Sequence, residues 1–110
     1  MTVGELKEAL SLEMLVAGDL DRPVTGGYCG DLLSWVMGRA GAGDAWITVM
    51  SNVNAIAVCV LAEVACLILA DSSPLDEAAR LRAATEGVAV LRSEQNTYEL
   101  AVALSRLLAS

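Results

Sequence analysis

The stretch GDLDRPVTGGYCGD, from Gly18 to Asp31, places several chemically useful residues in one short loop. Arg22 offers a cation, and Thr25 offers a hydroxyl group that is followed directly by two glycines. The paired glycines, Gly26 and Gly27, allow the backbone to take a positive φ and to approach a ligand closely. The stretch therefore has two interpretations, a ligand cradle and a turn held by local hydrogen bonds.

The glycines match neither of the two common phosphate-binding patterns. GxxxxGK[ST] and GxGxxG are both absent, and Asp31 at the start of the following helix would repel an anion. A local role is therefore the stronger interpretation, with Asp21 and Arg22 holding the turn. We expect Gly26 or Gly27 to have a positive φ or to lie against another backbone segment.

The residues that catalysis most often uses are scarce. The sequence has no His, and its three cysteines form no CxxC pair, so a zinc site lacks ligands and Cys29 lacks a base. We therefore predict no catalytic residue, no metal and no cofactor. The alternative is a small enzyme that combines Arg22, Thr25 and Asp31 with the loop at 51–54.

Apolar runs predict the elements that must position these loops. A continuous apolar run at 65–70 is typical of a strand covered on both faces, and further strands are predicted at 45–50 and 88–92. One helix is predicted to start at Ser51 or Asn52, and another is opened by Ser73–Pro74 with Asp76. A last helix follows the strand at 88–92, where Asn96 and Glu99 form a capping box.

The first forty residues contain a more mixed pattern. Thr2 and Glu5 predict a capped helix, and a strand follows at 13–17. The piece at 22–25 is predicted to be extended and to lie at a sheet edge or in a loop, because a proline cannot donate to a strand ladder. A helix that Asp31 caps or opens is predicted to run to residue 40.

The order of these elements predicts the fold class. From residue 45 onward strands and helices alternate, which gives parallel strands with helices on both faces. We predict a three-layer α/β/α domain with a mostly parallel sheet of about five strands, spanning residues 1–110 as one domain.

Three loops follow the predicted parallel strands at 50–54, 70–74 and 92–96, and all three are rich in Ser and Asn. Ligands of open α/β sheets bind at this edge, although helix capping would also explain such residues. The first loop, SNVN, has more hydrogen-bonding groups than one cap needs. We predict that a small polar ligand would contact Arg22, Thr25, Gly26, Gly27, Ser51, Asn52 and Asn54.

The charge balance excludes two classes of partner. The chain of 110 residues has 14 acidic and 7 basic residues, a net charge of −7, and the basic residues are scattered. Nucleic acids and anionic lipids both require basic clusters.

The N-terminus lacks the pattern of a signal peptide, and the apolar run at 55–70 is shorter than the roughly 20 residues of a membrane span. We therefore predict a cytoplasmic protein.

Trp35 is predicted to face away from the sheet. On a helix over 31–40 the spacing places Trp35 beside Arg39 and outside the apolar face. Because an exposed Trp is common at interfaces, we predict a homo-oligomer, most simply a dimer, with Trp35 and Arg39 at or near the contact. The alternative is that another segment, such as the glycine loop, covers Trp35. The residues of the predicted inward face are Leu32, Leu33, Val36, Met37 and Ala40.

The spaced residues Asp21, Arg22, Thr25, Gly26 and Gly27, with GDLLS and SNVN further on, resemble the DRTGG domain family. Members of this family occur as small free-standing prokaryotic proteins, beside CBS domains and within some phosphate acetyltransferases, where they look regulatory. Their fold resembles the N-terminal domain of HPr kinase/phosphorylase. The resemblance implies a noncatalytic regulatory or assembly module that binds a partner protein and a small polar ligand, and it implies no catalytic residues.

Overall fold

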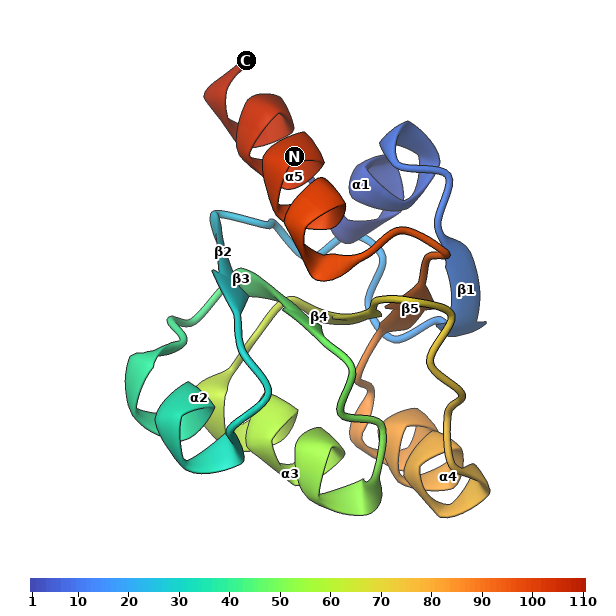
Figure 1. Ribbon diagram of the computed structural model, residues 1–110. Coiled ribbons are helices and arrows are strands. Elements are labelled where there is room, and N and C mark those ends of the chain that lie inside the picture. The colour runs from blue at the N-terminus through green and yellow to red at the C-terminus, as the bar shows by residue number, and fades with distance from the viewer.

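The computed structural model describes residues 1–110 and places a five-stranded sheet between two layers of helices (Figure 1). The strand order is β1-β5-β4-β3-β2. The pairs from β2 to β5 are parallel, whereas β1 runs antiparallel to β5. The predicted α/β fold with a mostly parallel sheet is therefore confirmed. The strands are β1 (Glu13–Val16), β2 (Gly26–Cys29), β3 (Asp44–Thr48), β4 (Cys66–Leu69) and β5 (Val90–Arg92).

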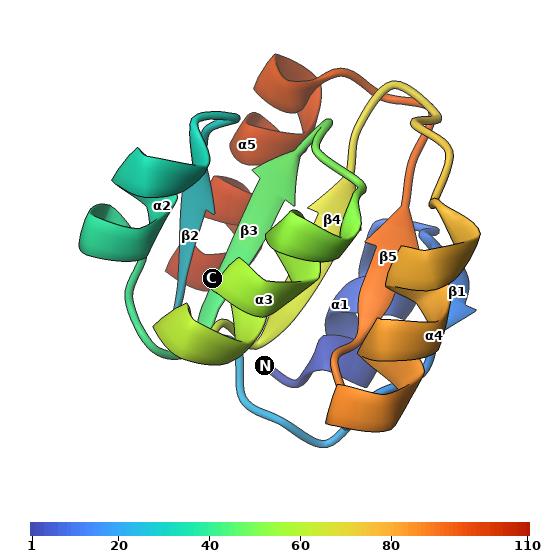
Figure 2. The same ribbon diagram turned by 90° about the horizontal axis from the view of Figure 1, so that it is seen from below.

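Helices cover both faces of the sheet (Figure 2). Each of α2, α3 and α4 connects two neighbouring parallel strands and lies on one face, while α1 and α5 cover the other. No helix has the length and apolar content that crossing a membrane requires. The helices are α1 (Val3–Ala9), α2 (Leu33–Arg39), α3 (Val53–Ala62), α4 (Glu77–Glu86) and α5 (Thr97–Ala109).

The central strands β3 and β4 supply both apolar layers. Every residue of β4 is buried, and successive side chains point to opposite faces. Ile47 therefore packs with the α1 and α5 layer, whereas Trp46 packs with the α2, α3 and α4 layer. Trp46 is fully buried, and its indole Nε1 donates to the carbonyl oxygen of Gly30 at 2.9 Å. Burial of a large ring with its polar atom satisfied anchors the connection after β2.

The predicted helix starts are confirmed where a side chain caps the helix. Thr2 and Glu5 form a capping box at α1, and Asn96 and Glu99 form one at α5. Asn52 caps α3, and Asp76 caps α4 by accepting from two backbone N–H groups. The sequence predicts these starts because each depends on contacts within four residues.

The second strand of the sheet is not among the predicted elements. It comprises Gly26–Cys29, whereas the piece at 22–25 lies in a loop, one of its two predicted places, and makes a single bridge, between Thr2 and Pro23. Glycine is unfavourable in strands, so no local pattern marks this segment as one. Its pairing with β3 residue by residue overrides that preference.

Asp31 does not cap α2, contrary to the prediction. The N-cap position is Leu32, which makes no capping hydrogen bond through its side chain. The Asp31 carboxylate instead accepts from Thr48 Oγ1 at 2.6 Å and from the Val49 N–H at 3.0 Å. It therefore ties the segment after β2 to the end of β3.

The outward position of Trp35 is as the spacing predicts. Its side chain is 53% exposed, and the Arg39 guanidinium stacks on the ring with 3.7 Å between Cζ and the ring centroid. Fewer residues of α2 are buried than its predicted inward face contains. Val36 is fully buried, whereas Leu32, the N-cap residue outside the helix, is 58% exposed and Met37 is 41% exposed.

Candidate functional site

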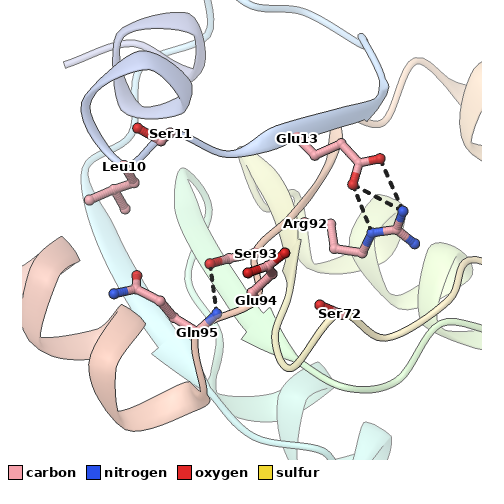
Figure 3. Close-up of a pocket in the computed structure, with 8 residues that line it drawn as sticks. All are labelled: Leu10, Ser11, Glu13, Ser72, Arg92, Ser93, Glu94 and Gln95. Carbon is pink, nitrogen blue, oxygen red and sulfur yellow. Dashed lines mark hydrogen bonds and ion pairs between the residues drawn. The ribbon is translucent and has the colours of Figure 1, made fainter.

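A polar cleft of about 670 Å³ lies at the carboxyl ends of β4 and β5, beside the start of β1 (Figure 3). Because β1 is antiparallel to β5, its first residue, Glu13, lies opposite Arg92 at the end of β5. The loops after β4 and β5 complete the walls. The lining residues are Leu10, Ser11, Glu13, Ser72, Arg92, Ser93, Glu94 and Gln95.

Arg92 is the cation of the cleft, and its guanidinium is already paired. Nε and Nη2 donate to the Glu13 carboxylate at 3.0–3.1 Å, as Figure 3 shows. Nη1 donates to the carbonyl oxygen of Ser73 at 3.4 Å. An anionic ligand would therefore have to compete with Glu13 for the same donors.

The backbone of the cleft is strained and firmly held. Ser11 and Ser72, together with Asp71, have φ values of 52°, 53° and 56°, in the left-handed region that non-glycine residues rarely adopt. The Asp71 N–H donates to the Gln95 carbonyl at 2.9 Å, and the Ser72 N–H donates to the Ser93 carbonyl at 2.8 Å. Such strained residues are concentrated at functional sites.

The groups that remain for a ligand are hydroxyls, an amide and a carboxylate. The side chains of Ser11, Ser72, Glu94 and Gln95 line the cleft and are not engaged by its ion pair. The two carboxylates and one guanidinium of the lining give it a formal charge of −1. This chemistry suits a polar ligand that presents hydroxyl or amino donors.

The predicted site residues of the DRPVTGG segment lie at the opposite end of the sheet. The Arg22 Nη2 donates to the carbonyl oxygen of Glu63, the left-handed residue that ends α3. The Thr25 N–H donates to the Gly43 carbonyl at 3.0 Å, just before β3 begins. Both residues therefore connect the start of β2 to the segments that precede β3 and β4.

A small hollow of about 210 Å³ adjoins Arg22. Its other charged lining residues are the acids Asp19, Glu63 and Glu86. An anion at this point would meet three carboxylates, which agrees with the sequence-based preference for a structural role of Arg22 over a phosphate cradle.

Gly26 and Gly27 do not have the positive φ that was one of the two expectations, but they meet the other, because both lie against the backbone of β3, with which they pair. The glycines with positive φ are Gly18, Gly43 and Gly87. Neighbouring side chains also leave no room for a Cβ atom at Gly26 or Gly27. A Cβ on Gly26 would lie 2.6 Å from Asp44 Oδ1, and one on Gly27 would lie 2.6 Å from Leu104 Cδ2.

The predicted loop at 51–54 lies at the carboxyl end of β3. Asn52 is used as the α3 cap, accepting from the Ala55 N–H at 3.0 Å, and the Ser51 carbonyl accepts from Asp76 at 3.4 Å. Asn54 is exposed. β3 alone spans roughly 16 Å, so the structure does not bring this loop together with Arg22 and the glycines. For the same reason Asp31 lies apart from Arg22 and Thr25.

The loops at 70–74 and 92–96, which follow predicted parallel strands, supply most of the cleft, although the sequence favours the loop at 51–54 over them. Ser11 and Glu13 are not among the residues that the sequence indicates. These two residues reach the cleft only through the antiparallel pairing of β1 with β5. Nothing in the local sequence around Glu13 specifies that pairing.

The fold and the cleft define a small α/β domain with a polar site at the carboxyl edge of its sheet. The sequence matches the model of the DRTGG domain over residues 5–107, and the chain therefore belongs to the DRTGG domain family. This confirms the family that the Asp-Arg and Thr-Gly-Gly residues indicate. No curated protein sequence matches the chain.

Among solved structures, the chain is similar to the CBS and DRTGG domains of the regulatory region of Clostridium perfringens pyrophosphatase, complexed with its activator, diadenosine tetraphosphate. The TM-score is 0.74 at 14% sequence identity. The match covers 97% of this chain but 45% of that one, so this chain spans less than half the length of that region. A likeness at this identity shows a shared fold.

Proposed function

We propose that this chain is a regulatory module of the prokaryotic cytoplasm that binds a small polar ligand in the cleft at the ends of β4 and β5. The observation that carries the proposal is the cleft itself, with its strained, hydrogen-bonded backbone and its unengaged polar side chains. Its position at the carboxyl edge is where open α/β sheets bind ligands. The three free cysteines agree with a reducing compartment.

The chemistry of the lining favours the sugar and base of a nucleoside over a free phosphate. Glu94 and Gln95 offer acceptors for ribose hydroxyls and exocyclic amino groups, whereas the Arg92 guanidinium is occupied by Glu13. The volume of about 670 Å³ falls within the range of about 300–1,000 Å³ for small-molecule sites. The nucleotide activator in the similar regulatory region supports the same ligand class.

Thermal shift measurements test this proposal directly. We expect adenosine, AMP or diadenosine tetraphosphate to raise the melting temperature, and acetyl phosphate to leave it unchanged. A ligand at about 100 times its Kd adds about 2.7 kcal/mol to the free energy of unfolding. A panel in which only acetyl phosphate stabilises the protein would contradict the nucleoside preference.

Matched variants locate the site. Glu94→Gln and Gln95→Ala change exposed side chains of the cleft, and we expect each to weaken binding about tenfold, or about 1.4 kcal/mol. Asn54→Ala changes an exposed side chain of the loop that the sequence favours, and serves as the control. Loss of binding in Asn54→Ala alone would overturn the cleft as the site and support the residues predicted from the sequence.

We also propose that the module acts as a homo-oligomer, most simply a dimer, with Trp35 and Arg39 at or near the contact. The exposed Trp35, with Arg39 stacked on its ring, supports this proposal. Stacking keeps the Arg39 side chain in place beside the ring, so the pair presents a preformed surface.

A further inference from the structure

The sheet has two open edges, and they are built differently. The β1 edge is interrupted by a register shift between Met14 and Val16 and begins with a charged residue, Glu13, both of which discourage pairing with another strand. The β2 edge, GGYC, has neither a charge nor a proline, and it pairs with β3 in continuous register. It therefore lacks the usual protection of an edge strand.

The backbone groups of this edge are arranged to accept a further strand. The Gly30 N–H donates to the Ile47 carbonyl of β3 at 3.3 Å. Backbone groups of successive residues in a strand point to opposite sides, so those of Gly27 and Cys29 face away from β3. Two N–H groups and two carbonyl groups are thus directed outward from the sheet.

Apolar surface lies on both sides of the same edge. A groove of about 450 Å³ runs between β2 and α5, and 5 of its 7 lining residues are hydrophobic. On the other face of the sheet α2 flanks β2 and carries Trp35 (Figure 2). The groove is lined by Gly27, Cys29, Ala101, Leu104, Ser105, Leu108 and Ala109.

The charge distribution favours a second copy at this edge. None of the 14 acidic residues lies in β2, in α2 or at 101–109, and these segments carry only Arg39 and Arg106. A chain with a net charge of −7 repels its own copies, and the repulsion is smallest where acids are absent.

We infer that two copies of this chain associate through β2, with the two strands antiparallel across a two-fold axis, and form one continuous ten-stranded sheet. A stable dimer buries about 800 Å² per partner, roughly 15% of the 5454 Å² surface. One short strand cannot supply this area, so the α5 groove and α2 with Trp35 pack across the axis as well. This inference rests on the proposed homo-oligomer and names its surface; it does not depend on the ligand.

Mass and cross-linking of the unmodified protein provide the first test. We expect light scattering to give twice the chain mass of 11.5 kDa. Cys29 is exposed while Cys59 and Cys66 are buried, so it is the natural cross-linking site. With the axis between Gly27 and Cys29, the two Cys29 Cα atoms lie roughly 5–14 Å apart. A short bismaleimide should then join two chains, and Cys29→Ser should abolish the product.

Variants distinguish this edge from other surfaces. Cys29→Pro removes an outward N–H, and Ala109→Glu places a charge in the groove; each should raise the dimer Kd at least about tenfold. Leu81→Glu is the control, because Leu81 is 61% exposed on α4. If Cys29→Pro fails to fold, Ala109→Glu and protection of the Cys29 amide from hydrogen exchange in the wild type decide the question.

The outcomes separate the two proposals. A wild type that stays monomeric at concentrations up to about 1 mM removes both the homo-oligomer and the β2 interface. A dimer that persists in Cys29→Pro and Ala109→Glu but dissociates in Trp35→Glu keeps the homo-oligomer and overturns pairing through β2.

Discussion

Gly18, two residues beyond the end of β1, is the position where a single added methyl group should cost most. Its φ is +55°, and a Cβ there would lie 2.3 Å from the backbone nitrogen of Ala89 and 2.7 Å from its Cα. Ala89 cannot withdraw easily, because its carbonyl accepts from the Leu67 N–H of β4 at 2.9 Å. Gly18→Ala therefore combines a left-handed conformation, about 1–2 kcal/mol, with overpacking against backbone, about 1–3 kcal/mol.

We expect Gly18→Ala to lower the free energy of unfolding by about 3 kcal/mol, a large part of the roughly 5–15 kcal/mol of a small domain. Urea denaturation followed by circular dichroism measures the change. Gly87→Ala is the matched control, because its φ is +72° but no atom lies within 4 Å of the added Cβ; only about 1 kcal/mol should be lost. The reasoning would be refuted if Gly18→Ala cost no more than Gly87→Ala.

Three further predictions concern buried thiols, the DR motif and the cleft. Burial raises the pKa of Cys59 and of Cys66 from 9.0 to about 12. The unfolded thiols ionise near pH 9 while the folded ones keep their protons, so the unfolded state binds fewer protons. Stability should fall between pH 9 and 12 by at most about 1.4 kcal/mol per pH unit for each thiol. Urea titrations of Cys59→Ala and Cys66→Ala should show a shallower decline than the wild type, and an equal decline would contradict this cause. Arg22→Met removes the donor to the Glu63 carbonyl and should cost about 1 kcal/mol by calorimetry, whereas Arg82→Met, which breaks only a surface ion pair of 3.9 Å, should cost little. A double-mutant cycle of Glu13→Gln and Arg92→Met should give a coupling of about 0.5–1 kcal/mol that shrinks in 1 M NaCl, since both side chains are partly exposed; a coupling indifferent to salt would argue against an ion pair.

The parts of the fold that sequence analysis predicted correctly depend on short-range chemistry. The caps at Thr2, Asn52 and Asn96 follow from contacts within one turn, and β4 follows from an uninterrupted apolar run. β2 could not be found in this way, because Gly26 and Gly27 oppose a strand and pairing with β3 alone makes them one.

The candidate site shows the same division. The loops after β4 and β5 are predicted from their place after apolar strands. Ser11 and Glu13 reach the cleft only because β1 pairs with β5, about eighty residues further along the chain. Asp31 illustrates the converse error. Its place before a helix predicts a cap, and its contact with Thr48 Oγ1, 17 residues away, takes precedence.

Arg22 and Thr25 are two of the residues that give the DRTGG family its name. Their hydrogen bonds to the carbonyl oxygens of Glu63 and Gly43 hold the segment before β2 at the amino edge of the sheet. In this chain the two signature residues therefore hold the architecture, and they lie at the opposite end of the sheet from the cleft. Substitutions in the loops at the carboxyl edge would change the lining of the cleft and leave these two contacts intact. Classification of DRTGG domains by physiological role should accordingly begin from the segments equivalent to 71–73 and 93–95.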